Sequence, residues 1–329
     1  MTVQDIPRGS PRMYFPGGFA LADAKACAAL VDVAYAQYSQ RENAGEPPAS
    51  NFNWNTPNNG YSYSAALFST FNYYDLFGYK YVATEPFGFV AVDASGNGYL
   101  VFRGAMTSAD GYADLTIDQT GYEIVANYGL VQEGYYCIYQ GFNSSIRQAI
   151  ASLAGTKPFQ SFFFTGHSLG SALSSLAIPD VLAGGSIQPN NVPVMHYNFA
   201  SPRVGDPQFA ASMNQNGVTT FRVVNTEDAV PDAPLAISGL STFYKHIGTP
   251  VDFTAQYDSI VSNHSLDTAY NYALQNPSNP EGQLTTAAPE LASRARMHVV
   301  IDAQLVRLTR ATIPPIISHG GRSSARLQG

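Results

Sequence analysis

The chain has 329 residues, enough for one large α/β domain with a sizeable core. Charged residues make up only 12% of it, well below the usual share of about 25%. The net charge is −7 and the isoelectric point is 5.3. Because Lys and Arg are scattered, no nucleic-acid partner is expected. No run of about 18 apolar residues predicts a membrane-spanning helix.

The N-terminus and the cysteines give weaker indications. The first residues lack a basic segment followed by an apolar one, so no secretory signal peptide is visible, although a mature secreted form is compatible with this. Cys27 and Cys137 are too few for a disulfide scaffold and match no metal spacing. We expect two buried thiols, with one disulfide between them as the alternative, and no metal or other cofactor.

The first part of the chain predicts helices followed by strands. Ala, Leu and Val recur at three- and four-residue spacing over residues 19–38, which is typical of an amphipathic helix. Residues 42–62 are rich in Asn, Pro, Gly and Ser and predict a loop, and the aromatic-rich residues 63–78 favour a second helix. Three predicted strands follow, with Gly96-Asn97 as a hairpin signal between the last two: Tyr79–Ala83, Phe87–Val92 and Gly98–Phe102.

Beyond residue 140 strands and helices alternate. The predicted helices are Ser145–Leu153, Ser168–Leu182 and Pro207–Asn214, and the predicted strands are Phe162–Thr165, Val192–Phe199 and Thr220–Val224. This alternation predicts an α/β fold, with a mainly parallel sheet covered by helices on both faces. Antiparallel hairpins at the front and near Phe243–Phe253 would make the sheet mixed.

The character of the chain changes near residue 280. Pro-Ser-Asn-Pro-Glu-Gly resembles a linker, a separate helix is predicted over 287–311, and the Gly-, Ser- and Arg-rich end is expected to be disordered. We therefore expect one catalytic domain over residues 1–280 and an appendage over 281–329 that the chemistry does not need.

Residues 166–170 read Gly-His-Ser-Leu-Gly and match the Gly-x-Ser-x-Gly pattern. The pattern lies between a short apolar strand and a long helix, so the chain must turn sharply at Ser168. Such a turn strains the backbone and exposes the hydroxyl at the helix N-terminus, where the helix dipole favours developing negative charge. A helix-capping serine is the alternative interpretation, but the pattern in this context favours Ser168 as a nucleophile.

Acyl transfer also needs backbone N–H donors directed at the tetrahedral oxygen. Leu169, directly after the serine, can supply one such donor. The strand ending Val101-Phe-Arg-Gly-Ala105 places Ala105 N–H as the candidate for the second, with an ordinary glycine turn as the alternative. The apolar and acidic residues 106–115 that follow predict a short lid.

A serine nucleophile needs a histidine base and a carboxylate that orients it, and in this type of fold the order is Ser, Asp or Glu, then His. Asp228 directly follows the strand ending at Val224, with Glu227 and Asp232 as rivals. His264 lies in a loop entering a helix, which suits a base better than His246, which is predicted to lie in a strand.

Several stretches, in this order over roughly residues 20–275, resemble the class 3 (fungal-type) lipase family of the α/β-hydrolase superfamily. They are Val-Phe-Arg-Gly-Ala (101–105), Ala-Asp-Leu (113–115), Gln-Gly-Phe (140–142), Thr-Gly-His-Ser-Leu-Gly-Ser-Ala (165–172), Phe-Ala-Ser-Pro-Arg-Val-Gly-Asp (199–206), Arg-Val-Val-Asn-Thr-Glu-Asp-Ala-Val-Pro (222–231), Tyr-Lys-His-Ile-Gly (244–248) and Asn-His-Ser-Leu-Asp-Thr-Ala-Tyr (263–270).

The resemblance implies a catalytic triad of Ser168, Asp228 and His264, and an oxyanion hole formed by Ala105 and Leu169. It also implies a lid near 106–114 and a lipid or aryl ester as substrate. Two positions depart from the family pattern. Ala105 stands where a Ser or Thr is usual, and Gly111 stands where many members have a lid tryptophan.

Together these features predict a cofactor-independent carboxylic ester hydrolase that acts through an acyl-enzyme, in the first place a triacylglycerol-type lipase with transient contact to a lipid interface. A short-chain or feruloyl-type esterase is the alternative among enzymes. A non-catalytic lipid-binding module with a vestigial site is the alternative from another class.

Overall fold

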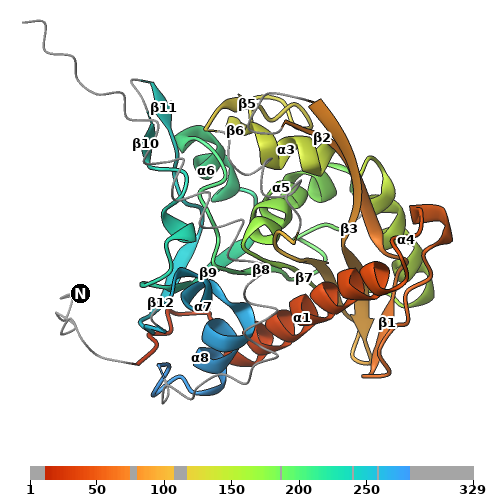
Figure 1. Cartoon of the computed structure of the whole chain (residues 1–329), viewed down its shortest axis with the longest axis horizontal. Helices are drawn as coiled ribbons and strands as arrows, with labels where there is room; N and C mark the ends of the chain where they lie inside the picture. Colours follow the sequence, from red (N-terminus) through yellow and green to blue (C-terminus); the bar gives the residue numbers. More distant parts are fainter. Residues whose placement is uncertain are drawn as a thin grey trace, which may run out of the picture.

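The computed structural model describes residues 12–74, 80–106, 117–185, 187–238, 241–257 and 259–281. Within them lies an eight-stranded sheet in the order β1-β3-β4-β7-β8-β9-β12, with β2 also paired to β3 (Figure 1). Its strands are β1 (Tyr61–Tyr63), β2 (Leu67–Tyr74), β3 (Lys80–Asp93), β4 (Asn97–Phe102), β7 (Ser161–His167), β8 (Val194–Phe199), β9 (Thr219–Asn225) and β12 (Thr249–Phe253). Pairing is parallel from β4 to β12 and antiparallel around β3, so the sheet is mixed and mainly parallel, as predicted.

Helices cover both faces of this sheet. They are α1 (Leu21–Asn43), α3 (Glu133–Gln140), α4 (Ser145–Thr156), α5 (Leu169–Ala183), α6 (Pro207–Met213), α7 (Ile260–His264), the π-helix η3 (Leu266–Asn271) and α8 (Tyr272–Gln275). The long helix α1 and the α8 region pack on one face, and α3, α4 and α5 pack on the other (Figure 1). Short 3-10 helices lie at η1 (Ala49–Asn51) and η2 (Val230–Asp232).

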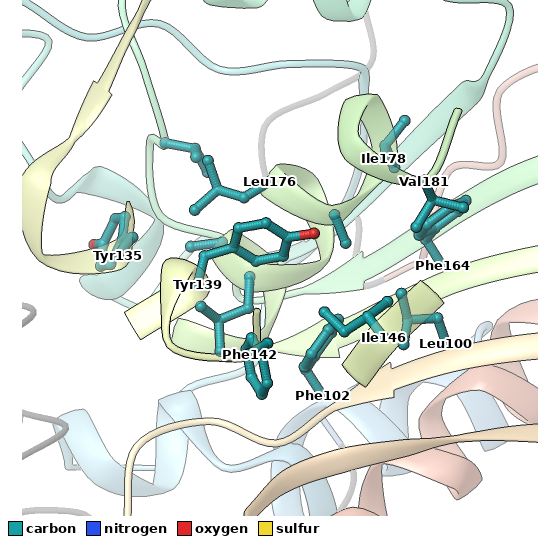
Figure 2. Close-up of a cluster of buried hydrophobic side chains, with 14 of the residues drawn as sticks. Leu100, Phe102, Tyr135, Tyr139, Phe142, Ile146, Phe164, Leu176, Ile178 and Val181 are labelled. Carbon is teal, nitrogen blue, oxygen red and sulfur yellow. The ribbon is translucent and has the colours of Figure 1, made fainter. Parts of the chain in front are cut away.

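The strand sequences explain these two cores. Leu100 and Phe102 of β4 lie in the core under α3, α4 and α5, whereas Tyr99 and Val101 lie in the core under α1. Successive side chains of a strand point to opposite faces, so a strand buried on both faces must be apolar throughout. Figure 2 shows the first core, where aromatic side chains from α3 meet those of the central strands.

The predicted helix over residues 63–78 is wrong, because Leu67–Tyr74, half of this segment, form strand β2. Leu67, Ser69 and Phe71 are buried, whereas Thr70 and Asn72 are exposed. This is a two-residue alternation, and aromatic residues favour strands. The predicted strands Tyr79–Ala83 and Phe87–Val92 are also one continuous strand, β3, which Pro86 does not interrupt.

The antiparallel hairpin predicted near Phe243–Phe253 is found only at its start, where Thr242–Phe243 pairs with Ile237–Ser238, and it does not join the central sheet. β12 runs parallel to β9. After β9 the chain crosses back to the end of the sheet where β9 begins, and only then enters β12. Two small antiparallel sheets lie outside the central one. They are formed by β5 (Gln119–Gly121) with β6 (Leu130–Gln132) and by β10 (Ile237–Ser238) with β11 (Thr242–Phe243).

The remaining predictions concern the two cysteines, a membrane-spanning helix, the lid and the C-terminal segment. Both cysteines are free thiols; Cys27 is buried, as expected, but Cys137 is only half-buried. None of the described helices is both long and apolar enough to cross a membrane. The predicted lid, apart from Met106 at its start, and the predicted C-terminal helix lie outside the described residues, so the division at residue 280 stays a prediction.

Candidate active site

Ser168 occupies the turn between β7 and α5. Its backbone is in the left-handed region, with φ 55° and ψ −127°, a strained conformation for a residue with a side chain. The flanking glycines permit the turn: a Cβ on Gly166 would lie 2.1 Å from Gly170 O, and a Cβ on Gly170 would lie 2.4 Å from Phe102 O. The turn is fixed further by Ser168 N–H, which donates to Phe199 O at 2.9 Å.

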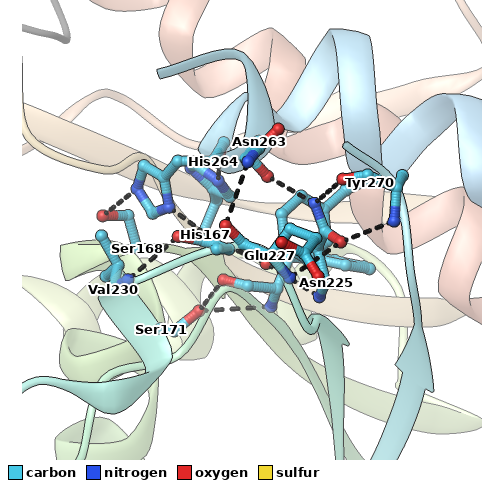
Figure 3. Close-up of polar contacts among 12 residues, drawn as sticks. His167, Ser168, Ser171, Asn225, Glu227, Val230, Asn263, His264 and Tyr270 are labelled. Atoms are coloured by element: carbon cyan, nitrogen blue, oxygen red, sulfur yellow. Dashed lines mark hydrogen bonds and ion pairs between the residues drawn. The ribbon is translucent and has the colours of Figure 1, made fainter. Parts of the chain in front are cut away.

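His264, the last residue of α7, lies between the serine and a carboxylate (Figure 3). Its Nε2 is 2.8 Å from Ser168 Oγ, and its Nδ1 is 2.8 Å from Asp228 Oδ2. An ionised carboxylate only accepts hydrogen bonds, so Nδ1 carries a proton and, in the neutral ring, Nε2 is the acceptor for the serine hydroxyl. The three side chains are thus arranged for proton transfer from Ser168 to His264.

Asp228 follows β9 and is almost fully buried, with 4% of its surface exposed. Its Oδ1 accepts from Val230 N–H at 3.0 Å, and its Oδ2 also accepts from Tyr270 O–H at 2.7 Å. Burial, and then the charge of Asp228, raise the pKa of Tyr270 well above its ordinary value. The phenol therefore stays protonated and donates to the carboxylate, which is compensated by three donors in all.

Two asparagines join the loops that carry Asp228 and His264. Asn225, at the end of β9, donates to Asn263 O at 3.0 Å, and Asn263 donates to Glu227 O at 3.1 Å. Each amide side chain therefore bonds to the backbone of the other loop (Figure 3). Buried side-chain amides that are fully hydrogen-bonded make an arrangement rigid, so the relative position of the carboxylate and the imidazole is set by this pair.

His167 connects the nucleophile turn to two other segments. Its Nε2 bonds to His264 O at 2.9 Å, and its Nδ1 bonds to Tyr35 Oη of α1 at 2.7 Å. The carbonyl can only accept, so Nε2 donates and, in the neutral ring, Tyr35 donates to Nδ1. Tyr35 Oη in turn accepts from Gly104 N–H at 2.9 Å. The imidazole rings of His167 and His264 also lie 4.7 Å apart, centroid to centroid.

The two predicted oxyanion donors lie on either side of the serine. Leu169 is the first residue of α5, so its N–H has no partner within the helix. Gly104 adjoins the serine closely, since a Cβ on it would lie 3.0 Å from Ser168 Cβ, and Ala105 follows it. Within the described part of the chain, neither the Leu169 nor the Ala105 N–H donates to a protein acceptor.

The rival candidates from the sequence lie elsewhere. Glu227 is exposed and accepts from Gln256, and Asp232 is exposed and pairs with Arg203 at 3.4 Å. His246 lies in irregular structure between β11 and β12, not in a strand as predicted. Burial, then the charges of Arg222 and Arg203, lower the pKa of His246 to about 3. Among the described residues no cluster of His, Cys, Asp and Glu could hold a metal ion.

Sequence reasoning missed Tyr35, His167 and Tyr270 as parts of this site. His167 directly precedes the nucleophile and Tyr270 ends the last matching stretch (263–270), so both had a local signal. Tyr35 had none, because it appears as an ordinary position of an amphipathic helix far from Ser168 in the chain.

A serine, an imidazole and a carboxylate joined in series, beside a strained turn of a mainly parallel sheet, form the arrangement that defines serine hydrolases of the α/β-hydrolase type. Residues 99–238 match the family model of class 3 lipases. This match agrees with the resemblance found in the sequence over that region.

Curated relatives agree with this assignment. The chain is 28% identical over 184 residues to a secreted mono- and diacylglycerol lipase A of Penicillium cyclopium, which covers 56% of this chain and 57% of that protein. It is 31% identical over 142 residues to a lipase of Rhizomucor miehei, covering 43% of this chain and 38% of that protein. The chain thus spans about half the length, or less, of these relatives.

Solved structures share the fold. The Rhizomucor miehei lipase in its native propeptide complex superposes with a TM-score of 0.52 at 21% identity, covering 77% of each chain. A lipase of Rhizopus microsporus var. chinensis gives a TM-score of 0.51 at 21% identity, covering 77% of this chain and 84% of that one. The α/β-hydrolase fold is therefore confirmed.

Proposed function

We propose that this protein hydrolyses carboxylic esters of lipids through an acyl-enzyme intermediate. The observation that carries the proposal is the continuous path from Ser168 Oγ through His264 to Asp228, with 2.8 Å at each step. Such distances are those of a nucleophile and base in hydrogen-bond reach, with the base oriented by a third group.

The chemistry follows from these contacts. Ser168 Oγ attacks the ester carbonyl carbon while His264 Nε2 takes the hydroxyl proton, and Asp228 stabilises the imidazolium that forms. Ala105 and Leu169 N–H stabilise the oxyanion of the tetrahedral intermediate. When this intermediate collapses, His264 gives its proton to the leaving alcohol. Water, deprotonated by the same imidazole, then attacks the acyl-enzyme and releases the acid and the free serine.

The substrate is inferred from the family and its relatives. Because class 3 lipases match the chain, we assign lipid esters as the substrate class, with triacylglycerols first and partial acylglycerols as the relatives' names indicate for those proteins. A short-chain or feruloyl-type esterase would share the same catalytic residues. The two differ in the acyl group that fits, which an ester panel separates.

A lipid interface is the partner that suits the apolar surface of the β10–β11 hairpin. Leu235, Ile237 and Phe243 are 55%, 63% and 45% exposed, and Ile237 lies opposite Phe243 in the β10–β11 hairpin. This hairpin projects from the body at the upper left of Figure 1 and follows the loop that carries Asp228. Exposed apolar side chains gathered at one place are typical of interaction sites.

The interface contact has its own test. Replacing Ile237 and Phe243 together by serine should leave hydrolysis of a soluble ester unchanged within about twofold, since neither contacts the triad. Hydrolysis of emulsified triacylglycerol should fall about tenfold or more. An apolar side chain that becomes buried in the lipid contributes roughly 2–3 kcal/mol to binding at the interface, and the double variant loses two of them. Equal losses on both substrates would refute the interface role.

The test of the catalytic proposal combines labelling with an ester panel. A fluorophosphonate should modify wild-type protein and not Ser168→Ala, and nitrophenyl esters of increasing chain length should be hydrolysed only by the wild type. Ser50→Ala, a change at an exposed serine, is the matched control and should retain full activity. Folded wild-type protein without labelling or hydrolysis would favour a non-catalytic lipid-binding module, and preference for short or aromatic acids would favour the esterase.

A further inference from the structure

Arg103 is a fully buried arginine directly before the loop of the proposed oxyanion hole. Its exposed fraction is 0%, and the hydrogen bonds of its guanidinium include Nε to Pro86 O at 2.8 Å, Nη1 to Gly104 O at 2.8 Å and Nη2 to Glu85 Oε2 at 3.0 Å. The first two acceptors are backbone carbonyls. The charge is balanced by Glu85, which is itself almost fully buried.

Two aromatic rings fix the plane of this group. The guanidinium carbon lies 4.3 Å from the ring centroid of Tyr38 on α1 and 4.4 Å from that of Phe87 on β3. Both distances are within the range of cation–π contacts. A planar guanidinium that contacts two rings and donates to three acceptors cannot rotate freely, so the position of Nη1 is fixed.

The acceptor Gly104 O belongs to the same peptide unit as the proposed donor, Ala105 N–H. A peptide is planar and trans, so its C=O and N–H point in opposite directions. Fixing the carbonyl on Nη1 therefore fixes the direction of the Ala105 N–H. A cation at the carbonyl oxygen also draws electron density from the amide, which makes this N–H a stronger donor, as in a hydrogen-bond chain.

Stability alone does not account for this arrangement. A buried ion pair is often no more stabilising than apolar side chains of the same size. The preceding peptide is held as well, since Gly104 N–H donates to Tyr35. In addition, Ala105 has no side-chain hydroxyl with which to contact an oxyanion, so at this position only the backbone N–H can do so.

We propose that Arg103 is a positioning residue, whose guanidinium orients and polarises the Gly104–Ala105 peptide so that Ala105 N–H stabilises the oxyanion formed at Ser168. This inference rests on the proposed ester hydrolysis. Arg103 does not contact the substrate; it acts through the peptide and therefore affects the transition state more than substrate binding.

The test replaces Arg103 by lysine, which keeps the charge but loses the planar fork and so cannot reach all three acceptors at once. On a soluble nitrophenyl ester, kcat should fall about 10- to 100-fold with KM unchanged within about twofold, since displacing an oxyanion donor costs less than the 10²- to 10³-fold loss from removing one. The inhibition constant of an alkyl boronic acid, whose tetrahedral adduct with Ser168 mimics the intermediate, should rise by a similar factor.

Two control variants separate positioning from stability. Arg222→Lys makes the same change at another buried arginine, whose Nε donates to Ile247 O away from the site. Glu85→Gln removes the balancing charge but leaves the bond from Arg103 to Gly104 O. Both should lower the melting temperature while kcat and boronate affinity stay within about threefold of wild type.

A measurement on the wild type covers the case in which Arg103→Lys does not fold. The carbonyl carbon of Gly104 should resonate downfield of ordinary glycines, because a charge-assisted hydrogen bond deshields it. Wild-type kcat and boronate affinity in Arg103→Lys, or an ordinary Gly104 carbonyl resonance, would overturn the role of Arg103. Failure of the proposed function shows differently, as folded wild-type protein that neither hydrolyses esters nor binds boronate.

Discussion

Replacing Asp228 by asparagine changes one oxygen to an NH₂ group in a place where only donors converge. His264 Nδ1–H and Tyr270 O–H donate to Oδ2, and Val230 N–H donates to Oδ1. If the amide nitrogen took the position of Oδ1, it would face Val230 N–H and neither group would have an acceptor. A buried donor without an acceptor costs about 1–3 kcal/mol. At the Oδ2 place it would donate to His264 Nδ1, because the Tyr270 hydroxyl can turn to accept.

The second orientation places the His264 proton on Nε2. This nitrogen then donates to Ser168 Oγ and can no longer accept the serine proton. Either orientation removes the negative charge that stabilises the imidazolium. In the analogous triad of a serine protease the same change lowers kcat by about 10⁴, which corresponds to about 5.4 kcal/mol in the activation free energy. We expect Asp228→Asn to lower kcat by about 10³- to 10⁴-fold, with little change in KM.

The assay is the steady-state hydrolysis of a soluble nitrophenyl ester, with the melting temperature measured in parallel. Asp232→Asn is the matched control, because this carboxylate is exposed and contacts Arg203 instead of His264; its activity should stay within about twofold of wild type. If Asp228→Asn retained more than a tenth of wild-type kcat, or if Asp232→Asn lost activity instead, Asp228 would not be the orienting carboxylate.

Two further predictions concern Ala105 and Asp32. Ala105→Ser adds a hydroxyl donor beside the backbone N–H, so kcat on the same ester should rise severalfold, less than the full value of an oxyanion donor because the hydroxyl must be ordered; a decrease would show that the side chain does not reach the oxyanion. Burial raises the pKa of Asp32, which accepts from Asn271 at 2.6 Å, to about 7. The folded state therefore binds this proton more tightly than the unfolded state, and stability should fall as pH rises from about 4 to about 7. Asp32→Asn should remove this loss and exceed wild-type stability by about 1–3 kcal/mol at pH 8 but not at pH 4; equal differences at both pH values in thermal unfolding would contradict the assignment.

The parts of the fold that the sequence predicted correctly are those with local signals. Residues 161–183 combine a strand with three consecutive phenylalanines, glycines at a turn and a long helix, so β7, Ser168 and α5 could be predicted from this stretch alone. The many aromatic residues of β2 suggest a helix, and only their two-residue alternation indicates the strand that forms. The direction of β12 depends on where the preceding segment returns to the sheet, and no local pattern contains that information.

The site shows the same division. Ser168, Asp228 and His264 each have a recognisable context, and the structure brings these three together. Tyr35 and Arg103 act on the site through contacts that join segments far apart in sequence, Tyr35 to His167 and Gly104 and Arg103 to Glu85. Such roles become visible only when the sheet places β3, β4 and β7 side by side and packs α1 across them.

The segment recognised by the family model, residues 99–238, therefore differs from the smallest piece of the chain able to do chemistry. It contains Ser168 and Asp228 but ends before His264, and it begins after α1 and β3. In isolation this segment would lack β3 beside β4, the helix α1 that covers one apolar face of the sheet, and the imidazole of His264. Anyone shortening this protein for expression or display should keep every residue from the first helix through Tyr270.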